Sequence, residues 1–277
     1  MKYSLWNRKL ATLFLILPLT ASAEFRTDIE FAKPGGFSLT LDANIPDGKG
    51  PFPTVIIVHG GGFVRGDKQT YVKPLFEPLT KANFTWFTIN YRMAPNYPFP
   101  AGVEDVEAAV RWVRAHAKEY KVNKKRIALM GESAGGHLVA FAGVTQARRT
   151  RVRAVVSFYG PHDFEKRARD TGTLSEGLQQ FTGVKELNEA GYEKLREDSP
   201  YYHVKKGLPK FLLIHGTKDE QVPYEESVRM CEKLKLYKNS CELFTVDGAP
   251  HGVGPWEANP FWHAYKNKMV TWLKAMM

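Results

Sequence analysis

The chain has 277 residues, of which 43% are hydrophobic and 25% are charged, and its formal net charge is +10. This composition is close to that of ordinary globular domains, and no internal repeat or low-complexity tract interrupts it. The basic residues are dispersed apart from short clusters at 124–126 and 148–151, and no nucleic-acid-binding motif accompanies them. We therefore expect no nucleic-acid partner.

The N-terminus has the pattern of an export signal. Three cations stand among residues 1–9, residues 10–19 are almost entirely apolar, and residues 21–23 follow the small-x-small pattern of a cleavage site. The apolar run is shorter than the roughly 20 residues that span a bilayer, although an N-terminal membrane anchor is the alternative. We expect a signal peptide at 1–23, a single domain at 24–277, and a secreted or periplasmic protein with no membrane association after cleavage.

Strand-like runs then alternate with helical runs along the chain. The expected strands are 37–45, 54–58, 85–90, 126–130, 152–158, 211–214 and 242–246, and the main expected helices are 103–119, 134–146, 224–237 and 261–275. This alternation predicts an α/β fold with a mostly parallel central sheet and helices on both faces. Such sheets place their active sites at the carboxyl ends of the strands.

Residues 162–200 break this rhythm. The segment is charged, contains four glycines and has only short apolar groupings. We expect it to form small helices over the strand ends, as a minimal lid and not as a separate domain.

The segment Gly131-Glu132-Ser133-Ala134-Gly135 directly follows one expected strand and opens a helix. This is the G-x-S-x-G pattern of a nucleophile elbow. The tight reversal strains the serine backbone, and the two glycines let strand and helix approach each other. We predict Ser133 as the nucleophile, with the N–H of Ala134 at the helix N-terminus stabilising a developing oxyanion.

Three consecutive glycines follow another expected strand, in the segment 59–63 (HGGGF). Their N–H groups can converge on one point, so we assign Gly60 and Gly61, with Ala134, as donors of an oxyanion hole. A phosphate-binding loop is the alternative reading, but no G-K-[ST] segment and no dinucleotide fingerprint follows. We expect His59 to be structural and to hold the loop.

An acid and a base stand on loops after two later strands. Asp219 follows strand 211–214, and His251 follows strand 242–246. A neutral His251 can accept the Ser133 proton and return it to the leaving group, while Asp219 fixes the imidazole tautomer. Glu220 is the competing acid. We prefer Asp219 because it lies at the strand exit, in a D-x-x-V-P context before a proline-started helix.

Together these segments resemble the α/β-hydrolase superfamily, and within it the hormone-sensitive-lipase-type esterases and the related bacterial carbohydrate esterases, which include acetylxylan and feruloyl esterases. The matching motifs are HGGGF (59–63), RGDK (65–68), YRMAP (91–95), GESAGGHL (131–138), HGTKDEQVP (215–223) and PHG (250–252). The resemblance implies an α/β-hydrolase fold for 24–277, an ester substrate in an open cleft, no cofactor and no metal.

Two features depart from the lipase-type pattern. Glu132 stands where those members commonly carry aspartate, and the stretch before residue 37 is too short for their larger N-terminal cap. The D-x-x-V-P context of Asp219 is closer to the carbohydrate-esterase group.

We therefore expect a serine carboxylic-ester hydrolase that acts through an acyl-enzyme and removes acetyl or feruloyl groups from a plant-wall polysaccharide such as xylan. The alternatives are a general short-chain carboxylesterase, an amide hydrolase of the arylformamidase or peptidase type, and a non-catalytic binding module on the same fold. Phe63, Tyr159 and Trp256 are expected to line the substrate cleft, with Phe99 and Phe164 as further candidates.

The two cysteines, Cys231 and Cys241, leave two possibilities open. Ten residues are enough for a helix to end and a strand to return, which fits a disulfide in an exported protein. Two separate buried thiols fit equally well. Neither the oligomeric state nor the acyl group of the substrate follows from the sequence.

Overall fold

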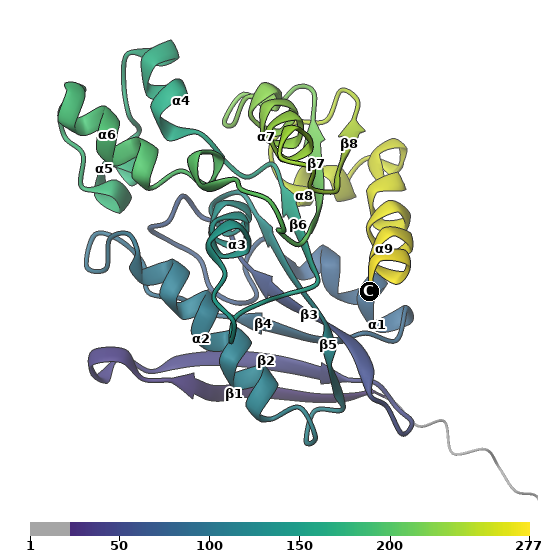
Figure 1. The fold of residues 1–277 in the computed structure, drawn as a ribbon. Helices are drawn as coiled ribbons and strands as arrows, with labels where there is room; N and C mark the ends of the chain where they lie inside the picture. The colour runs from purple at the N-terminus through teal and green to yellow at the C-terminus, as the bar shows by residue number, and fades with distance from the viewer. Residues whose placement is uncertain (1–22) are drawn as a thin grey trace, which may run out of the picture.

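The structure is a computed structural model that describes residues 23–277. The expected signal peptide, except for its last residue, lies outside the described residues. The described chain forms one eight-stranded sheet in the spatial order β1-β2-β4-β3-β5-β6-β7-β8 (Figure 1). In chain order the strands are β1 (Glu24–Ala32), β2 (Leu39–Ile45), β3 (Phe52–Val58), β4 (Thr85–Ile89), β5 (Val122–Glu132), β6 (Ala154–Phe158), β7 (Lys210–Gly216) and β8 (Cys241–Val246).

The neighbouring strands β4, β3, β5, β6, β7 and β8 are parallel to one another. The pairs β1–β2 and β2–β4 are antiparallel. Helices cover both faces. The larger ones are α2 (Ala101–Ala115), α3 (Ala134–Thr145), α7 (Tyr224–Leu236) and α9 (Ala264–Met276), and the short ones are α1 (Phe76–Lys81) and α8 (Val253–Glu257). Single 3₁₀ turns lie at Pro34–Gly36, Lys73–Leu75, Pro200–His203 and Pro260–Trp262. The expected α/β-hydrolase architecture is therefore confirmed.

The two-sided burial of the central strands explains their sequence. In β3, Ile56 and Val58 point into the hydrophobic cluster under α2, α3 and α7, whereas Val55 and Ile57 point into the cluster under α1, α8 and α9. Because successive side chains point to opposite faces, a strand covered on both faces must be apolar at every position. This is why β3 reads as a continuous β-branched run.

Strand β1 was not expected from the sequence. Most of its side chains are exposed, and several are charged or polar. It is an edge strand held by its pairing with β2, so it lacks the buried apolar pattern that reveals the central strands. Charged side chains on such an edge also discourage pairing with other chains.

Residues 162–200 form three short helices over one end of the sheet, as expected for a minimal lid (Figure 1). They are α4 (Phe164–Thr171), α5 (Glu176–Thr182) and α6 (Glu189–Glu197). Each begins after a residue whose side chain accepts a backbone N–H, namely Asp163, Ser175 and Asn188. Helices α4 and α5 end at glycines in the left-handed conformation. Local capping thus defines helices that are too short to be stable alone.

No helix within residues 23–277 is both long enough and apolar enough to cross a membrane. Cys231 on α7 and Cys241 at the start of β8 form a disulfide, with their Cα atoms 5.5 Å apart. Of the two possibilities left open by the sequence, the structure contains the bonded one. The bond joins the second half of α7 to the first residue of β8 at the edge of the sheet.

Replacing both cysteines by alanine should lower the free energy of unfolding by about 2–3 kcal/mol, because the crosslink restricts the unfolded chain. Urea unfolding followed by circular dichroism measures this difference. Wild-type protein treated with a reductant should move toward the variant, while the variant itself should not respond. Equal unfolding midpoints for the oxidised wild type and the double variant would contradict a stabilising disulfide.

Candidate active site

The three expected catalytic side chains lie on loops at the same edge of the sheet. Ser133 directly follows β5, Asp219 follows β7 and His251 follows β8. Because these strands are parallel, their carboxyl ends meet on one side of the sheet. The structure brings the three residues into a continuous hydrogen-bonded chain. His251 Nε2 lies 2.9 Å from Ser133 Oγ, and His251 Nδ1 lies 2.6 Å from Asp219 Oδ2.

Ser133 has a strained backbone, with φ 52° and ψ −119°. The turn fits only because its flanks lack side chains. A Cβ at Gly131 would lie 2.3 Å from the carbonyl oxygen of Gly135, and one at Gly135 would lie 2.2 Å from that of Val58. The N–H of Ser133 donates to the carbonyl of Phe158 at 2.9 Å. The two glycines therefore let the elbow close, and the sheet holds it.

Asp219 is held as a carboxylate. Its Oδ1 accepts the backbone N–H groups of Gln221 and Val222 at 2.9 and 2.8 Å. The imidazole of His215 lies 3.2 Å from Oδ2, opposite His251. Although burial opposes ionisation, hydrogen bonds from His215 and His251 hold the pKa of Asp219 well below its usual value.

An ionised Asp219 keeps the proton of His251 on Nδ1 and leaves Nε2 free to accept. Glu220, the competing acid, is exposed. Within residues 23–277, the hydrogen bonds of the His251 ring are to Asp219 and Ser133 and not to Glu220. Sequence reasoning gave His215 no role. Its place in HGTKDEQVP, four residues before the acid, is the only signal that could have indicated one.

The oxyanion donors differ from the sequence prediction. The N–H of Gly60 donates to Glu132 Oε1 at 2.5 Å, so it is not free to bind an oxyanion, and its assignment as a donor is wrong. Within residues 23–277 the amides of Gly61, Gly62 and Ala134 have no protein acceptor. They border the space above Ser133. Gly62 thus replaces Gly60, because Glu132 engages the first glycine of the loop.

The position of Gly61 requires a glycine. Its φ is +107°, and an added Cβ would lie 1.9 Å from the carbonyl oxygen of Arg65. The glycine loop is thereby folded back on itself, with Val64 and Arg65 N–H donating to the Gly61 carbonyl at 3.2 Å each.

Glu132 is the residue whose role the sequence did not reveal. It is buried between the glycine loop and the elbow, and burial raises its pKa to about 7, although the N–H of Gly60 opposes this shift. Its bond to Gly60 connects the loop after β3 to the end of β5. Glu132 therefore fixes the distance between the oxyanion donors and the nucleophile.

His59 behaves as the expected structural residue. Its Nδ1 lies 2.7 Å from the carbonyl oxygen of Gly60, and its ring stacks on Tyr91 with centroids 4.4 Å apart. Burial lowers its pKa to about 4, so it is neutral at physiological pH. It packs beneath the loop and not beside the nucleophile.

Two of the three aromatic residues expected in the cleft lie behind the base instead. Tyr159 and Trp256 have no exposed surface. The Tyr159 ring packs against His251 with centroids 4.6 Å apart, and its hydroxyl oxygen accepts the N–H of Val253 at 2.7 Å. Trp256 packs on Tyr159 and donates to the Pro250 carbonyl at 2.7 Å. Both support the His251 loop, so their assignment to the cleft is wrong.

Two hollows flank the nucleophile, and both include Gly62, Ser133, Gln221 and His251. The lid-side hollow, of about 320 Å³, is otherwise lined by Phe63, Ala134, Pro161, Phe164, Arg167, Ser175, Leu178, Glu220 and Val222. The glycine-side hollow, of about 290 Å³, is otherwise lined by Gly61, Arg65, Tyr71, Glu132 and residues 252–255. Phe63 and Phe164 border the lid-side hollow, whereas Phe99 borders neither hollow.

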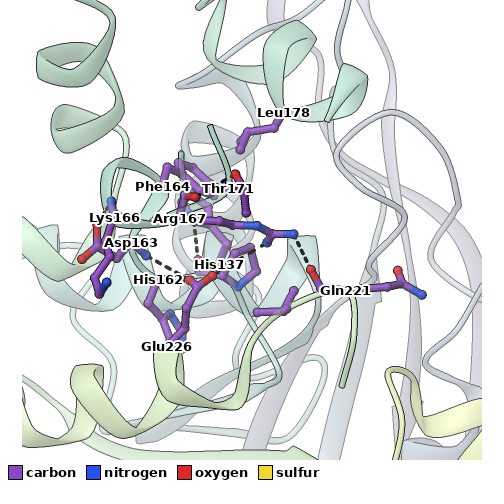
Figure 2. A network of polar contacts seen from close by, with 12 residues as sticks. His137, His162, Asp163, Phe164, Lys166, Arg167, Thr171, Leu178, Gln221 and Glu226 are labelled. Atoms are coloured by element: carbon purple, nitrogen blue, oxygen red, sulfur yellow. Dashed lines mark hydrogen bonds and ion pairs between the residues drawn. The ribbon is translucent and has the colours of Figure 1, made fainter. Parts of the chain in front are cut away.

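A buried polar cluster lies next to Arg167, which lines the lid-side hollow (Figure 2). Glu226 of α7 is 6% exposed, and its Oε2 accepts the N–H groups of His162 and Asp163 at 2.7 and 3.2 Å. Its Oε1 lies 3.8 Å from Arg167 Nη1. Burial raises the pKa of Glu226 to about 7, with the nearby Arg167 opposing the shift. In residues 23–277, no group of three or more His, Cys, Asp or Glu could hold a metal ion.

The chain is similar to known esterases in sequence and in fold. The family model BD-FAE matches residues 41–234. The Mycobacterium tuberculosis protein "Esterase LipC" is 31% identical over 214 residues, which are 73% of this chain and 53% of LipC. The chain spans about half the length of the curated relatives it matches.

Two solved structures are similar over almost the whole chain. A truncated carbohydrate esterase from gut microbiota has a TM-score of 0.79 at 25% identity, covering 92% of this chain and 96% of its own. A butyrate-bound esterase from Thermogutta terrifontis has a TM-score of 0.70 at 25% identity, covering 90% of this chain and 94% of its own.

The raised pKa of Glu226 makes stability depend on pH. The folded chain binds this proton more tightly than the unfolded chain, whose carboxyl has the ordinary value of 4.5. Stability should therefore fall as the pH rises from about 4.5 through about 7, by at most about 3 kcal/mol from this group. In Glu226→Gln this part of the fall should be absent, because glutamine does not ionise.

Urea unfolding at about pH 5 and about pH 8.5 gives the free energy of unfolding of each protein at both pH values. The loss of stability between the two pH values is then compared between the wild type and Glu226→Gln. Glu225→Gln, on the exposed side of the same helix, is the matched control and should follow the wild-type profile. If Glu226→Gln loses as much stability between the two pH values as the wild type does, Glu226 does not hold a proton in the folded state.

Proposed function

Because the chain belongs to the BD-FAE family, we propose that it hydrolyses carboxylic esters through an acyl-enzyme formed on Ser133. One observation carries this proposal: the chain of Ser133 Oγ, His251 and Asp219 has contacts of 2.9 and 2.6 Å, and it lies beside three backbone amides that have no acceptor among residues 23–277. A weakly acidic hydroxyl needs such a base, and the developing oxyanion needs such donors.

The acylation step follows from these positions. Ser133 Oγ attacks the ester carbonyl carbon while His251 Nε2 accepts its proton. The carbonyl oxygen gains the negative charge and binds the amides of Gly61, Gly62 and Ala134. Asp219 stabilises the imidazolium that forms. When the tetrahedral intermediate collapses, the C–O bond to the alcohol breaks and His251 donates its proton to the departing oxygen.

Deacylation repeats this sequence with water. His251 Nε2 accepts a proton from water as its oxygen attacks the acyl-enzyme carbonyl, and the same amides stabilise the second oxyanion. Collapse releases the carboxylic acid, and the proton on His251 returns to Ser133 Oγ. The two hollows flank the nucleophile, so they can hold the acyl and alcohol groups separately.

We further propose that the substrates are acetyl or feruloyl esters of a polysaccharide such as xylan. The similarity to a carbohydrate esterase over nearly all of both chains supports a carbohydrate ester. The two hollows beside Ser133, of about 320 and 290 Å³, support an aromatic acyl group in size, and Phe63 and Phe164 show that aromatic side chains border this space. The butyrate-bound relative favours the second candidate, a general short-chain carboxylesterase.

A secreted or periplasmic location completes the proposal. The Cys231–Cys241 disulfide supports it, since such bonds persist mainly in oxidising compartments. A polymeric wall substrate also requires the enzyme to act outside the cytoplasm.

A substrate panel distinguishes the two candidates. Acetylated xylan, methyl ferulate, short-chain triglycerides and N-formylkynurenine are compared by product release under identical conditions. Release of acetate or ferulate at the highest kcat/KM supports the polysaccharide proposal. Efficient cleavage of short-chain esters, with no acetate released from acetylated xylan and no ferulate released from methyl ferulate, would overturn the polysaccharide proposal. The second candidate, a general carboxylesterase, would then remain.

Ser133→Ala should lower kcat by on the order of 10⁶, because no other group can form the acyl-enzyme. Asp219→Asn should lower kcat by roughly 10⁴, because it disfavours the required imidazole tautomer. Stopped assays with para-nitrophenyl acetate measure both, with unfolding midpoints as the control for folding. A Ser133→Ala variant that retains turnover would remove this mechanism.

Glu132→Ala should lower kcat by roughly 10²-fold, because the glycine loop loses its bond to the elbow and the oxyanion donors shift. Glu132→Gln should retain most activity, since its amide oxygen can still accept the N–H of Gly60. The comparison of the two variants separates the anchor from the charge. Equal activity of Glu132→Ala and the wild type would show that the loop needs no such anchor.

A further inference from the structure

The lid-side hollow contains a cation that the hydrolysis mechanism does not use. Among the described residues that line it, Arg167 is the one permanent cation and Glu220 the one acid, and its walls are otherwise largely apolar. Ser133 and His251 border the same space. A substrate group seated there therefore lies between the scissile bond and a guanidinium.

Arg167 is fixed in place from two directions. It belongs to α4 of the lid, and its Nη2 donates to the carbonyl oxygen of Gln221 on the loop that carries Asp219. On its other side Nη1 lies 3.8 Å from Glu226 Oε1. Figure 2 shows the side chain extending from α4 toward Gln221, with Leu178 above it. The guanidinium is thus positioned before any substrate arrives.

Much of the hydrogen-bonding capacity of Arg167 remains unused. A guanidinium has five N–H donors, and within residues 23–277 one side-chain hydrogen bond engages it, the one to Gln221. The contact with Glu226 is too long for a hydrogen bond. The side chain is 26% exposed, so the remaining donors can reach a ligand while much of the side chain is shielded from water.

Nearby acids cancel this positive charge only in part. Glu226 is buried, and its pKa of about 7 leaves a fraction of it protonated at neutral pH. Glu220 is exposed at the rim, where water and salt screen its charge. A second anion close to Arg167 is therefore favoured.

We propose that Arg167 binds a carboxylate of the substrate, so that the enzyme prefers esters carrying a free carboxylate on the group seated in the lid-side hollow. Hemiesters of dicarboxylic acids and esters on uronic-acid-containing units belong to this chemical class. The planar fork of arginine suits bidentate binding of a carboxylate, and the half-buried position strengthens it. This inference rests on the proposed ester hydrolysis at Ser133.

The experiment uses two matched pairs of esters, one for each side of the scissile bond. For the acyl side, para-nitrophenyl hydrogen adipate is compared with para-nitrophenyl hexanoate, which replaces the terminal carboxylate by a methyl group. For the alcohol side, para-acetoxybenzoate is compared with para-acetoxybenzamide. Spontaneous hydrolysis is subtracted, and the selectivity is the ratio of kcat/KM for the anionic ester to that for the neutral ester.

In one of the two pairs, Arg167→Gln should lower this ratio by about tenfold or more relative to the wild type. Arg169→Gln is the matched control. It removes the same charge from the same helix, but Arg169 faces Glu165 and Tyr192 outside the hollow. Its selectivity should equal that of the wild type.

A second variant guards against a general disturbance of the lid. Glu226→Gln removes the acid that partly neutralises Arg167 and retains an oxygen that can accept the N–H groups of His162 and Asp163. At about pH 8.5, where the wild-type carboxyl is ionised, this variant should show a higher preference for the anionic ester than the wild type. A merely structural role for Arg167 predicts no such gain.

The other outcomes are distinguishable. If Arg167→Gln lowers anionic and neutral turnover equally in both pairs, or if Arg169→Gln lowers the selectivity as much, the anion subsite is overturned and the proposed esterase function stands. If the wild type hydrolyses none of the four esters, the proposed function itself fails with these substrates.

Discussion

The active site depends on the strained backbone of Ser133 between strand β5 and helix α3. A positive φ at a residue with a side chain is unfavourable, and it persists here because the surroundings allow no alternative. The flanking glycines let the carbonyl oxygens of Gly135 and Val58 approach where a Cβ would otherwise lie. The same close approach sets α3 against the end of β3, where the glycine loop begins. Nucleophile and oxyanion donors are thus positioned by one steric fit.

Two carboxyl groups beside this turn are tuned in opposite directions by their surroundings. Asp219 receives two backbone N–H groups and faces two imidazoles, so its pKa falls despite burial. Glu132 receives one backbone N–H and is otherwise enclosed, so its pKa rises to about 7. The number of hydrogen-bond donors around each carboxyl thus decides whether its pKa falls or rises. Asp219, with more donors, is ionised and orients the base, whereas Glu132 is a buried residue that anchors a loop.

The parts of this arrangement that the sequence predicted are those set by local pattern. Central strands covered on both faces must be apolar at every position, which made β3 recognisable, and the carboxyl ends of parallel strands meet at one edge, which brought Ser133, Asp219 and His251 together. Strand β1 was not predicted from the sequence, because an edge strand with exposed side chains needs no apolar pattern.

The misplaced site residues depend on contacts between distant segments. Gly60, Gly61 and Gly62 are consecutive glycines, so the local sequence does not distinguish them. Gly60 differs because its N–H donates to Glu132, which lies 72 residues later in the chain. Tyr159 and Trp256 are aromatic residues near catalytic loops, but whether such a ring faces a cleft or the core is decided by packing between the end of β6, α8 and α9. Their complete burial behind His251 could not be inferred from either segment alone.

The most direct test of the account is covalent labelling with a fluorophosphonate, which reacts with a serine only when a neighbouring base activates it. The labelled protein is digested and the adduct located by mass spectrometry. We expect one adduct per chain, on Ser133, and its loss in a His251→Ala variant that remains folded. An adduct on another residue, or labelling of Ser133 that survives the loss of His251, would contradict the connected serine, histidine and aspartate on which the account rests.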